Sequence, residues 1–463
     1  MSDAIQSMIQ FRNAPMTLFK AAACLMFALT GGWAQAGIPV EHWTLPSGAQ
    51  IYLVESPAIP MLDVQIDFDA GTRRDPAEQA GLASAMAGMM SKGLRAGVGR
   101  DHAPQLDENE LAEAWADLGA SFDAGASADR FSFSLRTLTY PELLRQAVAL
   151  AARQMAQPLF APESWLHERD RISAALREAN TKPATVASRA FAEAVYGDHP
   201  YGADERVQSL QRIAVDDLHA LHDRAIQSCR ARVTLVGNVN RAQAENLVVE
   251  LLARLPSGAS PDAACPPLPP VPEVQDLVTA SERFIAFDSA QAHLLIGQPG
   301  FKRDDPDFFA LTVGNYILGG GGFASRLTEE VRQKRGLSYS VYSNFLPGLH
   351  AGAFTVGLQT RPDQARQALQ VVRDVLASFV SDGPSASELQ AAKDYLIGSF
   401  ALRVDSNRKL LANVSNIAWY GLPLGYLDTW TQRIEAVSAE AVRSAMRRKL
   451  QPGRMVTVVV GAQ

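Results

Sequence analysis

The stretch Leu318–Phe345 reads LGGGGFASRLTEEVRQKRGLSYSVYSNF, and the interpretation of this 463-residue chain starts from it. A run of glycines is followed by residues of good helix propensity, which predict a short helix that contains Arg332. Gly336 predicts the end of that helix, because glycine is common just past a helix C-terminus. An alternating strand is expected next, and it presents Tyr339 seven residues after Arg332. The stretch therefore predicts a helix that carries a guanidinium, followed by a strand that carries a phenol.

A proline-dense segment, Leu255–Pro272, divides the chain into two portions that echo each other. The Arg-Gln-Ala elements and the final valine-rich strands are 88 residues apart in the first portion and 90 in the second. Echoes in the same order indicate a tandem duplication. We expect a domain at 37–254, a linker at 255–280 and a second domain at 281–463. The matched segments are Arg73–Pro76 with Arg303–Pro306, Arg145–Val148 with Arg366–Leu369, Tyr196–Gly202 with Tyr420–Tyr426, and Val233–Gly237 with Val456–Gly461.

Within each portion, strands and helices are expected in blocks. Residues 63–69 and 131–135 alternate with period 2, which is typical of half-buried antiparallel strands. Apolar residues from Ala365 to Phe379 recur at helical spacing, and Ser385 with Glu388 forms a capping box for the next helix. Helices packed on antiparallel strands predict an α+β fold class, with two similar sandwich halves.

Composition excludes several classes of protein. A hydrophobic fraction of 47% and a charged fraction of 20% are typical of an ordinary globular chain. With a net charge of −6 and no long cluster of lysine and arginine, nucleic-acid binding is not expected. Neither Cys229 nor Cys265 belongs to a sequence pattern typical of a metal site. The sequence leaves open whether they form a disulfide or stay as free thiols.

The N-terminal residues 1–36 are typical of a cleaved export signal. Arg12 and Lys20 precede a short apolar run at 21–30, and Ala34–Ala36 supplies the small-residue cleavage pattern. The run is too short to span a bilayer, so no membrane span is expected. Two alternatives stay open: initiation at Met8 or Met16, and a lipid anchor on Cys24.

The stretch Leu318–Phe345 closely resembles the second-half signature of the pitrilysin/insulinase-type zinc metallopeptidases, in their processing-peptidase-like bacterial branch. Ser47–Glu55, Ala70–Pro76 and Tyr196–Gly202 resemble other blocks of that family, so the resemblance covers nearly the whole mature chain. It implies two similar α+β halves that face each other across a chamber, a clamshell. It also implies that Arg332 and Tyr339 hold the backbone of a peptide substrate.

The zinc site of that family is missing from this chain. The family binds zinc with an HxxEH helix, in which two histidines lie one helical turn apart and a glutamate activates the zinc-bound water. Here those positions are Ser84, Ala87 and Gly88, and Ala174 and Ala175 stand where the third, acidic ligand is expected. The pair His219 and His222 and the isolated His199 are interpreted as structural. We therefore expect no zinc to bind to this chain.

The resemblance implies a catalytically incomplete, periplasmic subunit of a heterodimeric zinc metalloendopeptidase. Such a chain binds unfolded peptides through Arg332 and Tyr339 and completes the active site of a zinc-bearing HxxEH paralogue, with no activity on its own. The alternative is a non-enzymatic peptide-binding or scaffold homologue of the same fold. The residues at 84, 87 and 88 argue against a stand-alone zinc protease.

Overall fold

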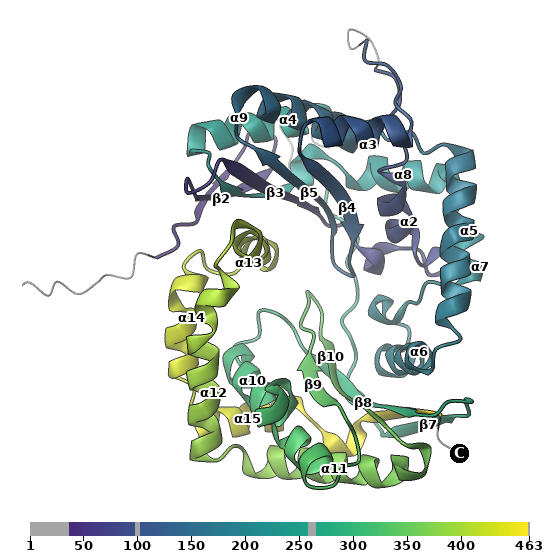
Figure 1. The fold of residues 1–463 in the computed structure, drawn as a ribbon, viewed down its shortest axis with the longest axis vertical. Helices are drawn as coiled ribbons and strands as arrows, with labels where there is room; N and C mark the ends of the chain where they lie inside the picture. The colour runs from purple at the N-terminus through teal and green to yellow at the C-terminus, as the bar shows by residue number, and fades with distance from the viewer. Residues whose placement is uncertain (1–36, 98–101, 258–264, 462–463) are drawn as a thin grey trace, which may run out of the picture. The chain divides into compact units, whose positions relative to one another are not determined.

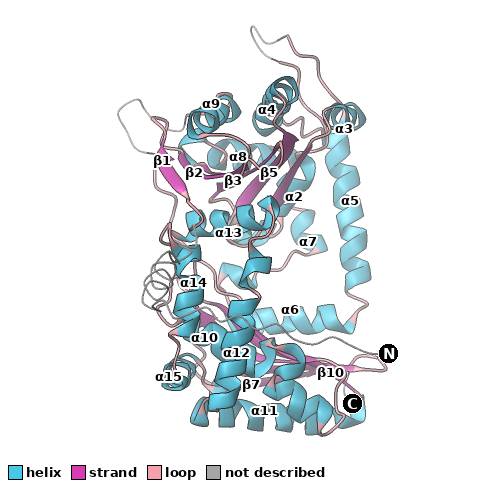
Figure 2. Ribbon diagram, turned by 60° about the vertical axis from the view of Figure 1, so that its left-hand side comes forward, coloured by secondary structure: helices cyan, strands magenta, loops and turns pink. Residues whose placement is uncertain are grey.

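The computed structural model describes residues 37–97, 102–257 and 265–461 (Figure 1). The expected export signal at 1–36 lies outside the described residues. Two β-sheets, each accompanied by helices, make up the described chain (Figure 2). A search of these residues finds no helix long and apolar enough to cross a membrane.

The first sheet has six strands in the order β1-β2-β6-β3-β5-β4. Neighbouring strands are antiparallel except β2 and β6, which pair in parallel although about 180 residues separate them in the sequence. The strands are β1 (Glu41–Thr44), β2 (Gln50–Glu55), β3 (Met61–Phe68), β4 (Ser121–Ala126), β5 (Phe131–Leu138) and β6 (Arg232–Gly237).

The second sheet has five strands in the order β7-β11-β8-β10-β9, and it repeats the first sheet without β1. Its one parallel pair, β7 with β11, corresponds to β2 with β6, and the other pairs are antiparallel in both sheets. This shared topology supports the predicted duplication. The strands are β7 (Ser281–Ile285), β8 (Ala292–Phe301), β9 (Val341–Phe345), β10 (Gly352–Thr360) and β11 (Val456–Val460).

The helices follow the same division. In the first half they are α2 (Leu82–Met89), α3 (Glu108–Asp117), α4 (Pro141–Ala156), α5 (Pro162–Ala179), α6 (Pro183–Tyr196), α7 (Val207–Leu210), α8 (Val215–Ala225) and α9 (Arg241–Leu252). In the second half they are α10 (Phe308–Asn315), α11 (Ala365–Asp382), α12 (Ala386–Gly398), α13 (Asn407–Tyr420), α14 (Tyr426–Glu435) and α15 (Ala439–Lys449). The predicted strands in β3 and β5, the helix α11 and the capping box of α12 are confirmed.

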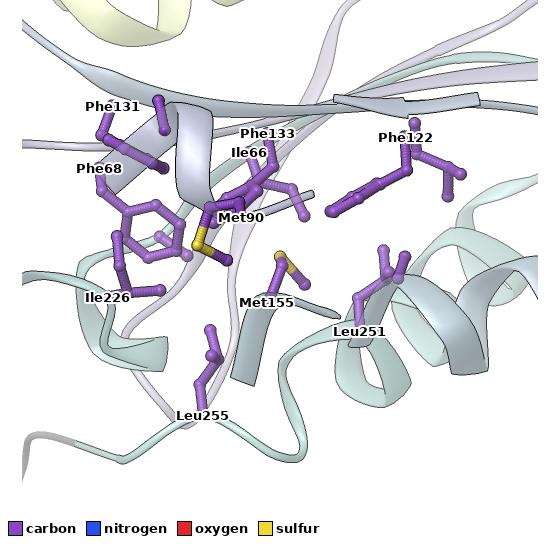
Figure 3. Packing of buried hydrophobic residues seen from close by; sticks show 14 of the residues in the cluster. Ile66, Phe68, Met90, Phe122, Phe131, Phe133, Met155, Ile226, Leu251 and Leu255 are labelled. Atoms are coloured by element: carbon purple, nitrogen blue, oxygen red, sulfur yellow. The ribbon is translucent and has the colours of Figure 1, made fainter. Parts of the chain in front are cut away.

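The main core of the first half lies between one face of its sheet and the helices. Alternate residues of β3, Leu62 to Phe68, point into this core and are fully buried with Phe131 and Phe133 of β5. Figure 3 shows Met90 and Met155 among these aromatic rings. Unbranched methionine fills irregular gaps between rings, which favours close packing.

Each sheet is also covered by one helix from the other half. Helix α6 packs on β8 and β11, where Phe191 joins a cluster with Val456 and Val458. Gly297 of β8 permits this approach, since a Cβ there would lie 2.8 Å from the ring of Phe191. In return, α13 packs on β6 and β3 (Figure 1). The two halves therefore exchange helices.

The face of the first sheet beneath α13 is polar and buried. Asp67 of β3 is only 1% exposed, and its carboxylate accepts hydrogen bonds from Ser132, at 2.5 Å, and from Ser415 of α13, at 2.8 Å. Arg130 donates to Asp67 at 3.2 Å and to Ser415 at 2.9 Å. The alternation of β3 predicted a half-buried strand with a polar outer face. The structure instead buries that face beneath α13. Burial of the Asp67 carboxylate is tolerated because Ser415 of α13 donates a hydrogen bond to it.

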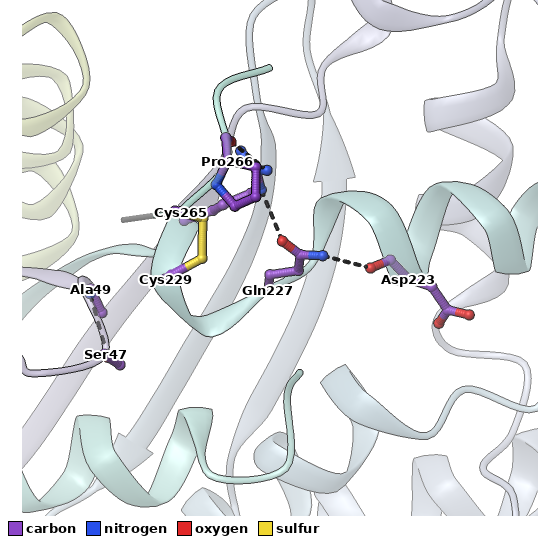
Figure 4. Close-up of a disulfide and its surroundings, with 8 residues drawn as sticks. Ser47, Ala49, Asp223, Gln227, Cys229, Cys265 and Pro266 are labelled. Atoms are coloured by element: carbon purple, nitrogen blue, oxygen red, sulfur yellow. Dashed lines mark hydrogen bonds between the residues drawn. A yellow bond between two sulfur atoms is a disulfide. The ribbon is translucent and has the colours of Figure 1, made fainter. Parts of the chain in front are cut away.

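Cys229 and Cys265 form a disulfide, which decides between the two alternatives that the sequence left open (Figure 4). Cys229 lies just before β6, and Cys265 lies in the proline-rich segment. Arg230 donates a further hydrogen bond to the carbonyl of Pro266, at 2.8 Å. The disulfide and this hydrogen bond tie the predicted linker to the first half. The domain boundaries at 254 and 281 remain a prediction.

Replacing both Cys229 and Cys265 by serine should lower the free energy of unfolding by about 3–4 kcal/mol. The bridge closes a loop of 36 residues, and a loop of that size restricts the unfolded chain by about this amount. Denaturant unfolding, followed by tryptophan fluorescence, measures the difference. Wild-type protein in excess dithiothreitol should match the double variant, and equal stability with and without the bridge would contradict the prediction.

Candidate functional site

The positions that correspond to the missing zinc ligands lie on one short helix, α2. Ser84 and Gly88 are half-buried on the same face, one turn apart, and Ala87 is buried in the core. The carboxylate of Asp75 accepts hydrogen bonds from the backbone N–H groups of Gly81, at 3.0 Å, and Ala83, at 3.1 Å, and so holds the start of the helix. Burial raises the pKa of Asp75 to about 7. The helix forms as the resemblance predicts, and its side chains at 84, 87 and 88 carry no histidine or carboxylate.

A carboxylate that the sequence reasoning missed lies beside this face. Glu168 of α5 is 5% exposed, and its Oε1 lies 3.2 Å from the place where a Cβ on Gly88 would be. Arg171 donates two hydrogen bonds to it, at 2.5 and 2.9 Å, and the bond from Arg171 lowers the pKa of Glu168. Ala174 and Ala175, predicted at the third-ligand position, are exposed on the same helix. Glu168 is therefore engaged in an ion pair.

A search for three or more histidine, cysteine, aspartate or glutamate side chains placed to hold a metal ion finds no such group in the described part of the chain. The histidines make structural contacts instead. His222 is buried, with Nε2 2.7 Å from the carbonyl oxygen of Met155. Nδ1 of His199 accepts from the N–H of Tyr201 at 3.0 Å, and its Nε2 lies 2.9 Å from the carbonyl oxygen of Pro272. Both histidines thus have the structural role predicted for them.

Arg332 lies in a π-helical turn, η7 (Thr328–Gln333), that follows the glycine run. Such wide turns are rare and often occur at functional sites. Two buried side chains, Val331 and Leu337, hold the two ends of the segment in the core. Gly336 adopts φ +62°, as its predicted role at the end of the helix requires, and its N–H donates to the carbonyl of Arg332 at 2.9 Å. The backbone around Arg332 is therefore well fixed.

Tyr339 does not lie in a strand, so that prediction is wrong. Strand β9 begins two residues later, at Val341. The reason is the buried hydroxyl of Ser338, whose Oγ lies within hydrogen-bond distance of the carbonyl oxygens of Gln359, at 2.6 Å, and Ser340, at 2.7 Å, and so holds a bend in the backbone before β9. The bend turns the side chain of Tyr339 outward, where it is 82% exposed. A role in the core is thereby excluded.

The structure brings Arg332 and Tyr339 together. The guanidinium carbon of Arg332 lies over the ring of Tyr339, 4.5 Å from its centroid, and over the ring of Phe323, 4.6 Å from its centroid. Within the described ranges, no oxygen atom accepts a hydrogen bond from the side chain of Arg332, and the hydroxyl of Tyr339 has no protein partner. These N–H and O–H donors are thus open to a ligand.

The neighbouring charges are paired, unlike Arg332. Lys334 and Arg335 each bind Glu330, both at 2.6 Å. Arg326, near the start of the same segment, forms a two-bond ion pair with Glu388 of α12, at 2.5 and 2.7 Å. The hydrogen bond from Arg326 lowers the pKa of Glu388 to about 2. This pair anchors the Arg332 segment to α12.

Glu388→Gln should lower the free energy of unfolding at pH 7 by about 1–2 kcal/mol, the usual contribution of a hydrogen bond to a charged group. The folded-state pKa lies below the ordinary 4.5, so the pair stabilises the fold above pH 4.5 and this contribution is lost as the pH falls toward 2. Denaturant unfolding of both proteins at several pH values measures the difference. It should shrink with acid, whereas Glu440→Gln, in an exposed pair with Arg443, should change nothing.

The first half contributes to the surroundings of this segment. The lining of a pocket of about 120 Å³ includes Ser340 and Tyr342, which follow Tyr339 in the sequence. Ala187 and Ser188 of α6 line the same pocket. The helix exchanged between the halves therefore borders the segment that carries Tyr339.

Family models and curated relatives both match the chain. The model described as insulinase (peptidase family M16) matches residues 50–205, and the model described as peptidase M16 inactive domain matches residues 212–396. An uncharacterized zinc protease of Mycobacterium leprae is 27% identical over 90% of this chain and 91% of its own length. The protein named non-peptidase homolog YmxG of Helicobacter pylori is 25% identical over 88% of this chain and 90% of its own length.

Solved structures match as well. A peptidase M16 inactive domain from Pseudomonas fluorescens is 32% identical, with a TM-score of 0.84 over 92% of this chain and 98% of that chain. A protease from Helicobacter pylori is 18% identical, with a TM-score of 0.80 over 91% of this chain and 99% of that chain, and shares the fold. These likenesses confirm the predicted fold class: α+β, with two similar halves in a clamshell.

Proposed function

This chain belongs to the insulinase family of peptidases, peptidase family M16, and from this premise we propose that it is a catalytically incomplete subunit of a heterodimeric zinc metalloendopeptidase. It binds unfolded peptides with Arg332 and Tyr339 and completes the active site of a zinc-bearing paralogue. The zinc ion and the attacking water belong to that partner. The chain on its own is inactive.

The observation that carries this proposal is the pair of unused donors on Arg332 and Tyr339. A guanidinium 4.5 Å from the ring of an 82% exposed tyrosine has no protein acceptor among the described residues. Most other arginines that the structure describes nearby, such as Arg326 and Arg335, are in ion pairs. Donors aimed at a carbonyl hold a peptide and stabilise the oxyanion that forms when water attacks it.

The face of α2 supports the assignment of zinc to a partner. A hydroxyl at Ser84 and a hydrogen at Gly88 cannot replace two imidazoles, and the methyl of Ala87 cannot take a proton from water. The one carboxylate beside Gly88, on Glu168, is held by Arg171. The residues of this chain thus supply peptide binding and no metal chemistry.

The proposal places the protein in the periplasm. The expected export signal at 1–36 leads the chain out of the cytoplasm. The disulfide between Cys229 and Cys265 is consistent with this location, because such bonds persist in oxidising compartments.

A second candidate function is a non-enzymatic peptide-binding or scaffold protein. The observation that favours it is the loss of every metal-ligand position on α2, together with the similarity to a relative named as a non-peptidase homolog. Under this alternative, Arg332 and Tyr339 still hold peptides, but no partner gains activity from them.

Mixing experiments separate the two candidates. This chain and a zinc-bearing paralogue are purified separately, and cleavage of a quenched unfolded peptide is measured for each alone and for the mixture. The proposal expects activity in the mixture only, and no stoichiometric zinc in this chain by elemental analysis. Absence of any gain on mixing would favour the scaffold function, and cleavage by this chain alone, free of contaminants, would exclude both.

A further inference from the structure

Phe323 is a large apolar side chain on the surface, with 68% of its area exposed. It lies in the short turn η6 (Gly322–Ala324), directly after the glycine run. Phe323 is not part of the buried core, and it is not one of the proposed hydrogen-bond donors. We propose that Phe323 is a positioning residue of the peptide-holding site, which orients the guanidinium of Arg332. This inference rests on the proposed peptide-binding role of Arg332.

The guanidinium of Arg332 lies against two aromatic rings. The guanidinium carbon of Arg332 lies over the ring of Phe323, 4.6 Å from its centroid, and nearly the same distance, 4.5 Å, from the centroid of Tyr339. Cations are attracted to the negative face of an aromatic ring, and an arginine stacks on such faces particularly well. Two exposed rings therefore hold one guanidinium.

Hydrogen bonds fix the backbone that carries Phe323. The side-chain amide of Gln333, the residue next to Arg332, donates to the carbonyl of Phe323 at 3.2 Å. Within the turn, the hydroxyl of Ser325 donates to the carbonyl of Gly322 at 2.7 Å. Gly322 itself adopts φ +57°, a conformation that favours glycine. The ring is thus held in register with the turn that carries Arg332.

The ring faces also direct the N–H donors of Arg332. A guanidinium stacked on ring faces keeps its N–H groups in its own plane, directed away from the rings. An unrestrained arginine side chain loses rotamer freedom when it binds a ligand. Stacking restricts the guanidinium before the peptide arrives, so that less freedom is lost on binding. Phe323 accordingly strengthens peptide binding without donating a hydrogen bond itself.

Peptide affinity of the full chain alone tests this inference. A fluorescein-labelled unfolded peptide is titrated with wild-type protein and variants, and binding is followed by fluorescence anisotropy. Phe323→Leu removes the ring but keeps apolar bulk, whereas Phe323→Tyr keeps an aromatic face. Tyr140→Leu, a substitution of another largely exposed aromatic residue, in the first half, is the matched control. Thermal unfolding verifies that each variant folds.

Phe323→Leu should weaken binding about three- to fivefold, the usual size of an exposed cation–π contact. Phe323→Tyr should retain the wild-type affinity, as should Tyr140→Leu. In the Arg332→Ala background, Phe323→Leu should have no further effect, because the two residues act through one contact. This rescue and this coupling are not expected of an aromatic residue that only supports the fold.

The inference fails while the proposed function stands if Phe323→Leu keeps wild-type affinity when Arg332→Ala binds weakly, or if leucine and tyrosine at position 323 weaken binding equally. Additive losses for the double variant would also overturn it. If Arg332→Ala itself binds as wild type, the proposed peptide-binding function fails, and the role of Phe323 fails with it.

Discussion

Arg332→Ala should reduce cleavage by the mixed pair of subunits by about 100-fold or more, while the chain keeps its fold. Loss of a single donor to a developing oxyanion has an effect of about that size. The folded state should tolerate the change, since the structure shows only ring contacts for this side chain. The rate of hydrolysis of a quenched peptide by the mixture measures the loss.

Arg335→Ala is the matched control for this prediction. It removes the same charge three residues away, from a side chain that is already paired with Glu330. The control should retain nearly full activity, and Tyr339→Phe, which removes one hydroxyl, should fall between the two variants. If Arg335→Ala lost as much as Arg332→Ala, the effect would be one of overall charge, and the role assigned to Arg332 would be wrong.

Asp67→Ala should lower the free energy of unfolding by about 3–5 kcal/mol, the usual result of breaking a buried ion pair. The carboxylate is 1% exposed and accepts hydrogen bonds from Arg130, Ser132 and Ser415. Without it, the Arg130 charge stays beneath α13 with no compensating anion. Denaturant unfolding at neutral pH gives the difference.

Asp63→Ala offers a comparison on the same strand. Asp63 is also buried, but its partner Arg136 is 32% exposed, and among the described residues no hydrogen bond joins either of them to α13. The charge left on Arg136 can be hydrated, so this variant should lose clearly less stability than Asp67→Ala. Equal losses for the two variants would show that the contact with α13 adds nothing.

Local pattern was sufficient to predict most of the elements. The alternation in residues 131–135 predicted β5, and helical spacing from Ala365 to Phe379 predicted α11, because a side-chain period reports directly on which face is buried. The same patterns could not show that α6 and α13 pack on the sheets of the opposite halves. An amphipathic sequence marks an apolar face but carries no information about the sheet that covers it.

The candidate site was predicted in part, for similar reasons. The signature singled out Arg332 and Tyr339, and the structure brings these two side chains together, although the bend at Ser338 ended the alternation before β9. Glu168 was missed because its ion pair with Arg171 and its position beside Gly88 depend on how α5 and α2 pack. Phe323 gave no signal, since a single aromatic residue after glycines has no periodic context.

The exchange of α6 and α13 has a consequence for the order in which the chain can mature. A nascent first half that ends at residue 254 has one sheet face bare, with Asp67 and Arg130 open to water, and a helix α6 whose sheet is not yet made. Those surfaces close only when residues 407–420 and β11 have been synthesised. Folding is therefore completed late, and a cut in the proline-rich segment would leave two pieces that still hold each other.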